Sequence, residues 1–389
     1  MTIREAARMR LIQPFHVMAL LARARELEAA GRSIIHMEIG EPDFITPQPL
    51  IDAGVKALQD GHTHYTPATG LVALREKIAG YYQSRYGVSV AAERIVVTPG
   101  ASSALQLVLT ALVNSGDRVL LSDPGYPCNR NFVHLLNAEP VALAVDAASS
   151  YQPLSQQVSD SWTGQTKALL VASPSNPTGT LLDEQLLRDY HAIAARNGGS
   201  LIVDEIYHGL TYDGPASTAL AVSDDIFVVN SFSKYFGMTG WRLGWLVAPR
   251  AVVPTIDKLA QNLFLAAPTP AQYAALRAFD ADVLAILDAR RDEFRARRDY
   301  LLPALRDIGF DIPVNPAGAF YLYANCSRFT DDSYGFAQNL LEETGVAITP
   351  GIDFGSNQPE RHLRFAYTTG MSKLKEGVRR MGEAVCSMQ

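Results

Sequence analysis

The chain has 389 residues, of which 48% are hydrophobic and 19% are charged, so it can bury a large core and is not disordered. Its length suggests two domains, and its net charge of −6 excludes nucleic acid as the main partner, because phosphate binding leaves a basic footprint. No apolar run approaches the roughly 20 residues of a membrane span. The three cysteines lack metal-ligand and disulfide spacing, so we expect reduced thiols, no metal, no membrane partner and a cytoplasmic protein.

The first 45 residues are predicted to pack with a smaller lobe that the C-terminal part of the chain forms. The apolar run 17–21 is short and is followed by alternating charges, which is typical of an amphipathic helix and not of a signal peptide. A strand is expected at 34–39. It leads into the loop Gly40-Glu41-Pro42-Asp43, where glycine and proline end regular structure.

Residues 46–284 are predicted to form a large α/β domain. Helices are expected at 49–60 and 71–86, on either side of the irregular segment 61–70. From residue 93 onward, strands that are apolar on both faces alternate with helices, which predicts a mainly parallel sheet sandwiched by helices. The expected strands are 94–98, 118–121, 168–172, 201–204, 226–230 and 243–247.

Residues 285–389 are predicted to form the smaller α+β domain. An arginine-rich amphipathic helix is expected at 288–305, and its charges indicate a solvated face. Strands are expected at 319–323, 346–348 and 363–366, with helices between them.

Polar residues follow the predicted strands at their carboxyl ends, where ligands bind in sheets of this kind. Lys234 follows a buried strand, and Ser231, Ser233 and Arg242 lie close to it in the sequence. A lysine in this position can form a Schiff base with an aldehyde cofactor, and the hydroxyls and the guanidinium suit the phosphate of that cofactor. The alternative is a surface loop with a solvated lysine.

Two further strand ends offer complementary chemistry. Gly100-Ala101-Ser102 opens a helix whose free N–H groups favour a phosphate, and the alternative is a helix start without a ligand. Asp204 ends an apolar strand, where its carboxylate would suit the protonated ring nitrogen of pyridoxal phosphate. The alternative for Asp204 is a helix N-cap.

Four more residues complete the candidate set. Asn176 and Tyr207 suit a phenolate oxygen, and Tyr126 offers a flat face to a heteroaromatic ring. Singly, these residues are also typical of a turn asparagine or of tyrosines at the edge of a core. Arg364 lies within an apolar strand and suits the two oxygens of an α-carboxylate, with an internal salt bridge as the alternative.

In this order, these residues resemble the class I/II aminotransferases of fold type I, in the aspartate aminotransferase superfamily. Those proteins depend on pyridoxal 5′-phosphate. The resemblance extends from the Gly40-Glu41-Pro42-Asp43 loop to Arg364. It is specific because Asn176-Pro177-Thr178-Gly179 and Ser231-Phe232-Ser233-Lys234 occur together and in this order.

The resemblance implies a role for each matched residue. Lys234, Asp204 and Tyr207 would be the catalytic residues: Lys234 would bind the cofactor covalently and Asp204 would pair with its ring nitrogen. Tyr207 and Asn176 would bind the phenolate oxygen, and Tyr126 would stack on the ring. The phosphate would be held by Ala101, Ser102, Ser231, Ser233 and Arg242, and the substrate α-carboxylate by Arg364, Asn176 and the Gly40 backbone. Tyr65 would reach the phosphate of a neighbouring subunit, which implies a homodimer with shared active sites.

The implied reaction is ping-pong transamination between an L-amino acid and a 2-oxo acid. Some relatives use the same residues for carbon–sulfur β-elimination, which is the alternative, or for closing a cyclopropane ring. Others sense effectors in transcription regulators that carry an additional N-terminal DNA-binding domain. An acidic chain with about forty residues before the Gly40 loop is not expected to be such a regulator.

The expected substrate has an apolar, aromatic or small side chain, although aspartate is not excluded. Dicarboxylate-specific relatives supply a second cation, either a lysine near the position of Ser102 or an arginine from the partner subunit. The corresponding stretch 261–268 has no arginine. Phe15 and Phe264 are the candidate walls of an apolar pocket.

Overall fold

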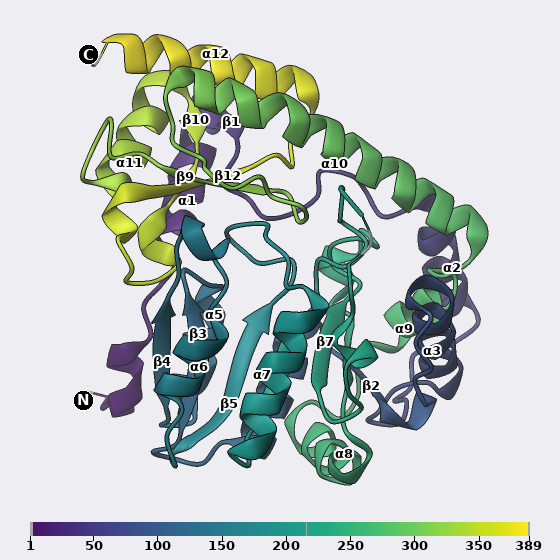
Figure 1. Cartoon of the computed structure of the whole chain (residues 1–389). Helices are drawn as coiled ribbons and strands as arrows, with labels where there is room; N and C mark the ends of the chain where they lie inside the picture. The colour runs from purple at the N-terminus through teal and green to yellow at the C-terminus, as the bar shows by residue number, and fades with distance from the viewer. Residues whose placement is uncertain (1–2, 215, 388–389) are drawn as a thin grey trace.

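A computed structural model describes residues 3–214 and 216–387 of the chain. A large sheet is covered by helices, and a smaller group of strands and helices sits beyond one end of it (Figure 1). Within the described ranges, no helix combines the length and the apolar character needed to cross a membrane.

The large sheet has seven strands in the order β2-β8-β7-β6-β5-β3-β4. The pairs formed by β7, β6, β5, β3 and β4 are parallel, whereas β8 runs antiparallel between β7 and β2. The mainly parallel sheet that the sequence predicted is therefore confirmed. The strands are β2 (Ile95–Thr98), β3 (Arg118–Asp123), β4 (Glu139–Ala144), β5 (Thr166–Ala172), β6 (Ser200–Asp204), β7 (Phe227–Ser231) and β8 (Gly244–Val247).

Helices bury both faces of this sheet, because successive strand residues point to opposite sides. In β3, Leu120 belongs to one buried core cluster, and Val119 and Leu121 belong to another. The first cluster includes residues of α3, α6, α7 and α9, and the second includes residues of α4, α5 and α8. The bounds are α3 (Val72–Tyr86), α4 (Ala101–Leu112), α5 (Pro127–Leu135), α6 (Ser155–Ser161), α7 (Glu184–Arg196), α8 (Val253–Leu263) and α9 (Thr269–Ala275).

The smaller group combines the two ends of the chain. Strand β1 (Ile35–His36) pairs in parallel with β10 (Val346–Ala347), and β12 (His362–Ala366) lies between β11 (Thr349–Pro350) and β9 (Tyr321–Asn325). Helix α10 extends across both groups, above the large sheet in Figure 1. The other helices are α1 (His16–Ala29), α2 (Gln48–Gln59), α10 (Ala281–Ile308), α11 (Ser333–Thr344) and α12 (Met371–Ser387). The domain boundaries at residues 45 and 284 remain predictions.

Some elements differ from the expected ones. Strand β4 was not predicted, because Pro140 and exposed residues make this edge strand look irregular in sequence. Strand β1 has two residues instead of six, although Met37 still exchanges main-chain hydrogen bonds with Ala347 and Ala366. Helix α10 begins seven residues earlier than expected, at Ala281. None of these differences moves the carboxyl ends of β3, β5, β6 and β7.

Candidate active site

Lys234 lies three residues beyond the end of β7 and is partly buried. Its Nζ donates a hydrogen bond to the main-chain oxygen of Gly40, at 2.5 Å. Burial lowers the pKa of this amine from 10.5 to about 8; the negative charge of Glu41 opposes the shift, and the positive charges of Arg364 and Arg242 add to it. A substantial fraction of the amine is therefore neutral, and nucleophilic, near physiological pH.

Asp204 is the last residue of β6 and is buried. Burial raises the pKa of its carboxyl from 3.8 to about 7, whereas the N–H of Ile206 and the charge of Lys234 act in the opposite direction. The N–H of Ile206 donates to Oδ1 at 3.1 Å, and no α-helix begins here, so the N-cap alternative does not apply. In the described part of the chain Asp204 has no ion-pair partner, so a cationic ligand group would offset its burial.

The N-terminus of α4 meets a guanidinium that has no carboxylate partner in the ranges 3–214 and 216–387. Gly100 precedes the helix with φ +80°, and a Cβ there would lie 2.3 Å from Nη2 of Arg242. Glycine thus permits Arg242 to approach the helix end. Arg242 is exposed, and its Nη1 donates to the main-chain oxygen of Thr239 at 3.1 Å. Ala101 and Ser102 form the first turn of the helix.

Two serine hydroxyls adjoin the same helix end. Ser231 pairs with Gly244 of β8, and a Cβ on Gly244 would lie 2.8 Å from the main-chain nitrogen of Ala101. The hydroxyl of Ser231 donates to that of Ser233 at 2.8 Å. Helix N–H groups, hydroxyls and a guanidinium are the donors that a phosphate accepts from, so this corner suits a dianion.

Arg364, on β12, is 6% exposed and has no carboxylate within ion-pair distance among the described residues. Its Nη1 donates to Oδ1 of Asn176 at 3.0 Å. Its Nη2 donates to the main-chain oxygen of Glu38 at 2.6 Å and to the hydroxyl of Thr349 at 3.1 Å. Its Nε has no hydrogen-bond partner. The internal salt bridge is thus excluded within these ranges, and the buried charge suits an anionic ligand.

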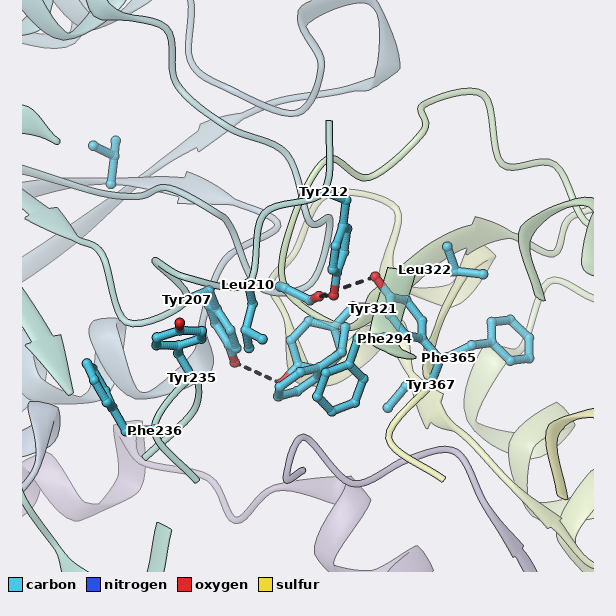
Figure 2. Close-up of a cluster of buried hydrophobic side chains, with 14 of the residues drawn as sticks. Tyr207, Leu210, Tyr212, Tyr235, Phe236, Phe294, Tyr321, Leu322, Phe365 and Tyr367 are labelled. Carbon is cyan, nitrogen blue, oxygen red and sulfur yellow. Dashed lines mark hydrogen bonds between the residues drawn. The ribbon is translucent and has the colours of Figure 1, made fainter. Parts of the chain in front are cut away.

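Tyr207 and Tyr321 link the two sides of the site. Their hydroxyls lie 2.8 Å apart, and Figure 2 shows them pointing toward one another. The Tyr321 ring also lies under the guanidinium of Arg364, with 4.3 Å between the guanidinium carbon and the ring centre. Tyr126 is half-buried just before α5, and burial raises the pKa of its phenol. Tyr207, Tyr321 and Arg364 therefore belong to one hydrogen-bonded, packed region.

Tyr65 was also predicted as a site residue, but within its own chain it does not lie with the residues described above. Its side chain is 82% exposed, in the segment between α2 and α3. That segment is held to α9, since Thr269 donates to the main-chain oxygen of His64 and Gln272 donates to the hydroxyl of Thr66. Tyr65 thus projects outward from a supported loop.

Sequence reasoning missed three contributors to the site. Tyr321 was assigned to a strand without a role, and neither Glu38 nor Thr349 was considered. Glu38 acts through a main-chain oxygen, which no side-chain pattern reveals. For Tyr321 a usable signal existed, because a tyrosine hydroxyl on an otherwise apolar strand needs a buried partner.

Comparison with known proteins decides the family. The profile of the family "Aminotransferase class I and II" matches residues 32–381. The chain belongs to this family. A (5-formylfuran-3-yl)methyl phosphate transaminase of Methanocaldococcus jannaschii is 39% identical over 374 residues, covering 95% of this chain and 96% of the relative. A valine–pyruvate aminotransferase of Mycobacterium tuberculosis is 37% identical, with 95% and 96% covered. A crystal structure of an aminotransferase from Mycobacterium tuberculosis superposes with a TM-score of 0.95 at 36% identity, with 99% and 100% covered.

The protein is therefore a pyridoxal phosphate-dependent aminotransferase of fold type I. Among the described residues, three observations fit this cofactor: a buried carboxyl without an ion-pair partner, a lysine of lowered pKa, and a guanidinium without a carboxylate partner at a helix N-terminus. The relatives named above are transaminases and give no support to the alternative of β-elimination.

Proposed function

We propose that Lys234 is the residue that holds pyridoxal phosphate covalently and then acts as the general base and acid of transamination. The observation that carries this proposal is the position of its Nζ, 2.5 Å from the main-chain oxygen of Gly40, together with a pKa lowered to about 8. A neutral amine beside the substrate can take a proton from the α-carbon and return it to a neighbouring carbon.

The other residues of the proposed site bind and orient. When bound, pyridoxal phosphate supplies an electron-accepting ring that stabilises negative charge at the α-carbon. Asp204 would keep the ring nitrogen protonated, and Tyr207 and Asn176 would donate hydrogen bonds to the phenolate oxygen. Tyr126 would stack on the ring. Ala101, Ser102, Ser231, Ser233 and Arg242 hold the phosphate.

Arg364 binds the α-carboxylate of the amino acid or 2-oxo acid in this proposal, with Asn176 and the Gly40 backbone beside it. The support is that its guanidinium is buried without a carboxylate in the described ranges, while its Nε lacks a partner. A bidentate carboxylate would satisfy both the charge and the free N–H.

We also infer that the enzyme is a cytoplasmic homodimer in which Tyr65 of one subunit reaches the phosphate bound by the other. The support is the 82% exposure of Tyr65 and the exposed apolar side chains of Leu263 and Leu265. These two residues lie at the end of α8 and the start of the segment that leads into α9, the helix that holds the Tyr65 loop. Exposed apolar residues of this kind are typical of a surface that another chain covers.

Substitution of Lys234 tests the proposal. Lys234→Ala should lose the absorbance of the covalently bound cofactor and nearly all turnover, whereas Lys258→Ala, at an exposed lysine of α8, should keep both. Borohydride reduction followed by peptide mass analysis should locate the cofactor on Lys234 in the unaltered protein. Attachment at another lysine would refute the assignment.

A second assay separates transaminase from lyase activity. It measures the ammonia and pyruvate released from cystathionine, alongside transamination with a panel of amino donors.

A further inference from the structure

A cavity of about 410 Å³ adjoins the site described above. Its lining includes Tyr126 and Asn176 of that site, together with Gln13, Asn129, Arg130 and Ser356. It therefore lies between α5, the carboxyl ends of β3 and β5, and the chain segments just before α1 and after Asp353. Its volume is within the range of small-ligand sites.

Arg130 lines this cavity and has no carboxylate partner in the described part of the chain. Its Nη2 donates to the main-chain oxygen of Asp353 at 2.9 Å. The nearby carboxylates bind other donors: that of Asp353 accepts from the N–H of His16 at 2.8 Å, and that of Asp123 accepts from the hydroxyl of Ser356 at 2.7 Å. A partly buried guanidinium whose charge is unbalanced is stabilised by an anion.

The rest of the lining is consistent with an organic ligand that carries such an anion. Asn129 is 8% exposed, and its Oδ1 has no hydrogen-bond partner, so it can accept from a ligand donor. Leu121, Leu170 and Phe354 supply apolar wall. Phe15 and Phe264, the walls expected from the sequence, are not among the lining residues.

Asn176 connects the cavity to the substrate. It accepts the hydrogen bond from Nη1 of Arg364 and also lines the cavity. A substrate whose α-carboxylate lies on Arg364 therefore has the cavity beside it. We propose that this cavity binds the substrate side chain and that Arg130 binds a carboxylate or phosphate at the end of that side chain.

This inference rests on the proposed function, because it takes Arg364 as the α-carboxylate site. It also revises the expectation of an apolar side chain, which followed from the lack of a second cation at Ser102 and in the stretch 261–268. Arg130 provides that cation from a place in the fold that the sequence did not indicate.

Arg130→Gln tests the inference with donors that differ only in charge. The pairs are glutamate with glutamine and aspartate with asparagine, and an ω-phosphono amino acid of matching length distinguishes phosphate from carboxylate. The first half-reaction of the holoenzyme is followed by the absorbance of bound cofactor. Arg130→Gln should lower the efficiency with anionic donors about 10- to 100-fold and that with neutral donors less than about 2-fold. Arg250→Gln, at an exposed arginine, should change neither.

Equal losses for both members of each pair, or no loss, would overturn the inference. A second measurement uses the unaltered holoenzyme, so it does not depend on the variant folding. Dicarboxylic acids should bind at least about tenfold more tightly than monocarboxylic acids of the same chain length, and equal affinities would also overturn the inference. If neither the anionic nor the neutral donors react with the unaltered holoenzyme, the proposed function is refuted separately, and the binding comparison still decides the role of Arg130.

Discussion

The chemistry of Lys234 depends on how much of its amine is neutral. Burial lowers the pKa to about 8, so the neutral fraction rises steeply between about pH 7 and pH 9. Only the neutral amine attacks an aldehyde. The rate at which the apoprotein captures pyridoxal phosphate should therefore rise with pH to a plateau with a midpoint near 8. An exposed lysine would give a midpoint near 10.5. Stopped-flow absorbance of the captured cofactor measures this profile.

Substitution of Glu41 tests the electrostatic account of the Lys234 pKa. Its negative charge raises the pKa of Lys234, against the effect of burial, and its carboxylate accepts a hydrogen bond of 2.5 Å from the Thr239 hydroxyl. Glu41→Gln should therefore shift the capture midpoint to lower pH. Glu93→Gln, at an exposed carboxylate, should leave the midpoint unchanged. A shift to higher pH for Glu41→Gln would contradict this electrostatic account.

At the scale of elements, β9 and β12 bring together residues that lie far apart in the sequence. Tyr321 begins β9 and Arg364 lies on the paired strand β12, so the tyrosine ring packs under the guanidinium. The hydroxyl of Tyr321 contacts that of Tyr207, which follows β6 of the large sheet. Strand pairing thus holds Arg364 and, through the Tyr321 hydroxyl, Tyr207 in a fixed relation.

Two substitutions at Tyr321 separate these contacts. Tyr321→Phe removes the hydroxyl and keeps the ring, so kcat should fall about 3- to 10-fold, with KM for the amino donor nearly unchanged. Tyr321→Leu also removes the ring, so KM should rise about 3-fold or more as well. Tyr300→Phe on α10 is the control. Steady-state kinetics with one donor check the split, and a KM that rises equally in both Tyr321 variants would contradict it.

The sequence predicted where the candidate cofactor residues meet because most of them lie at strand ends of one mainly parallel sheet. Strand order brings Asp204 and the Ser231–Lys234 turn to a common edge without further information. The surroundings of Arg364 were less predictable. Arg364 bonds to the main-chain oxygen of Glu38, 326 residues away, and that contact depends on how the N-terminal segment packs against β12. Edge strand β4 was not predicted because Pro140 and several exposed residues interrupt the alternation of buried and exposed side chains that is typical of a strand.

At the scale of the whole molecule, the position of Tyr65 bears on whether a second subunit completes the site. All other predicted cofactor residues converge within one chain, whereas Tyr65 is 82% exposed on a loop that α9 supports. A side chain held in this way loses little entropy when it meets a partner. A phosphate bound by a neighbouring subunit would accept a hydrogen bond from it.

A hybrid dimer tests whether the sites are shared. In a purified heterodimer of Lys234→Ala and Tyr65→Ala subunits, the site with the intact lysine receives Tyr65 from the other subunit, and the second site lacks both groups. Shared sites therefore predict about half of the wild-type activity and bound cofactor per dimer, measured after dialysis at low cofactor concentration. Sites built within single subunits predict no more than the mean of the two mutant homodimers, because each site would then lack one group. Differently tagged subunits allow the heterodimer to be isolated, and a heterodimer of wild-type and Lys234→Ala subunits calibrates the activity of one intact site.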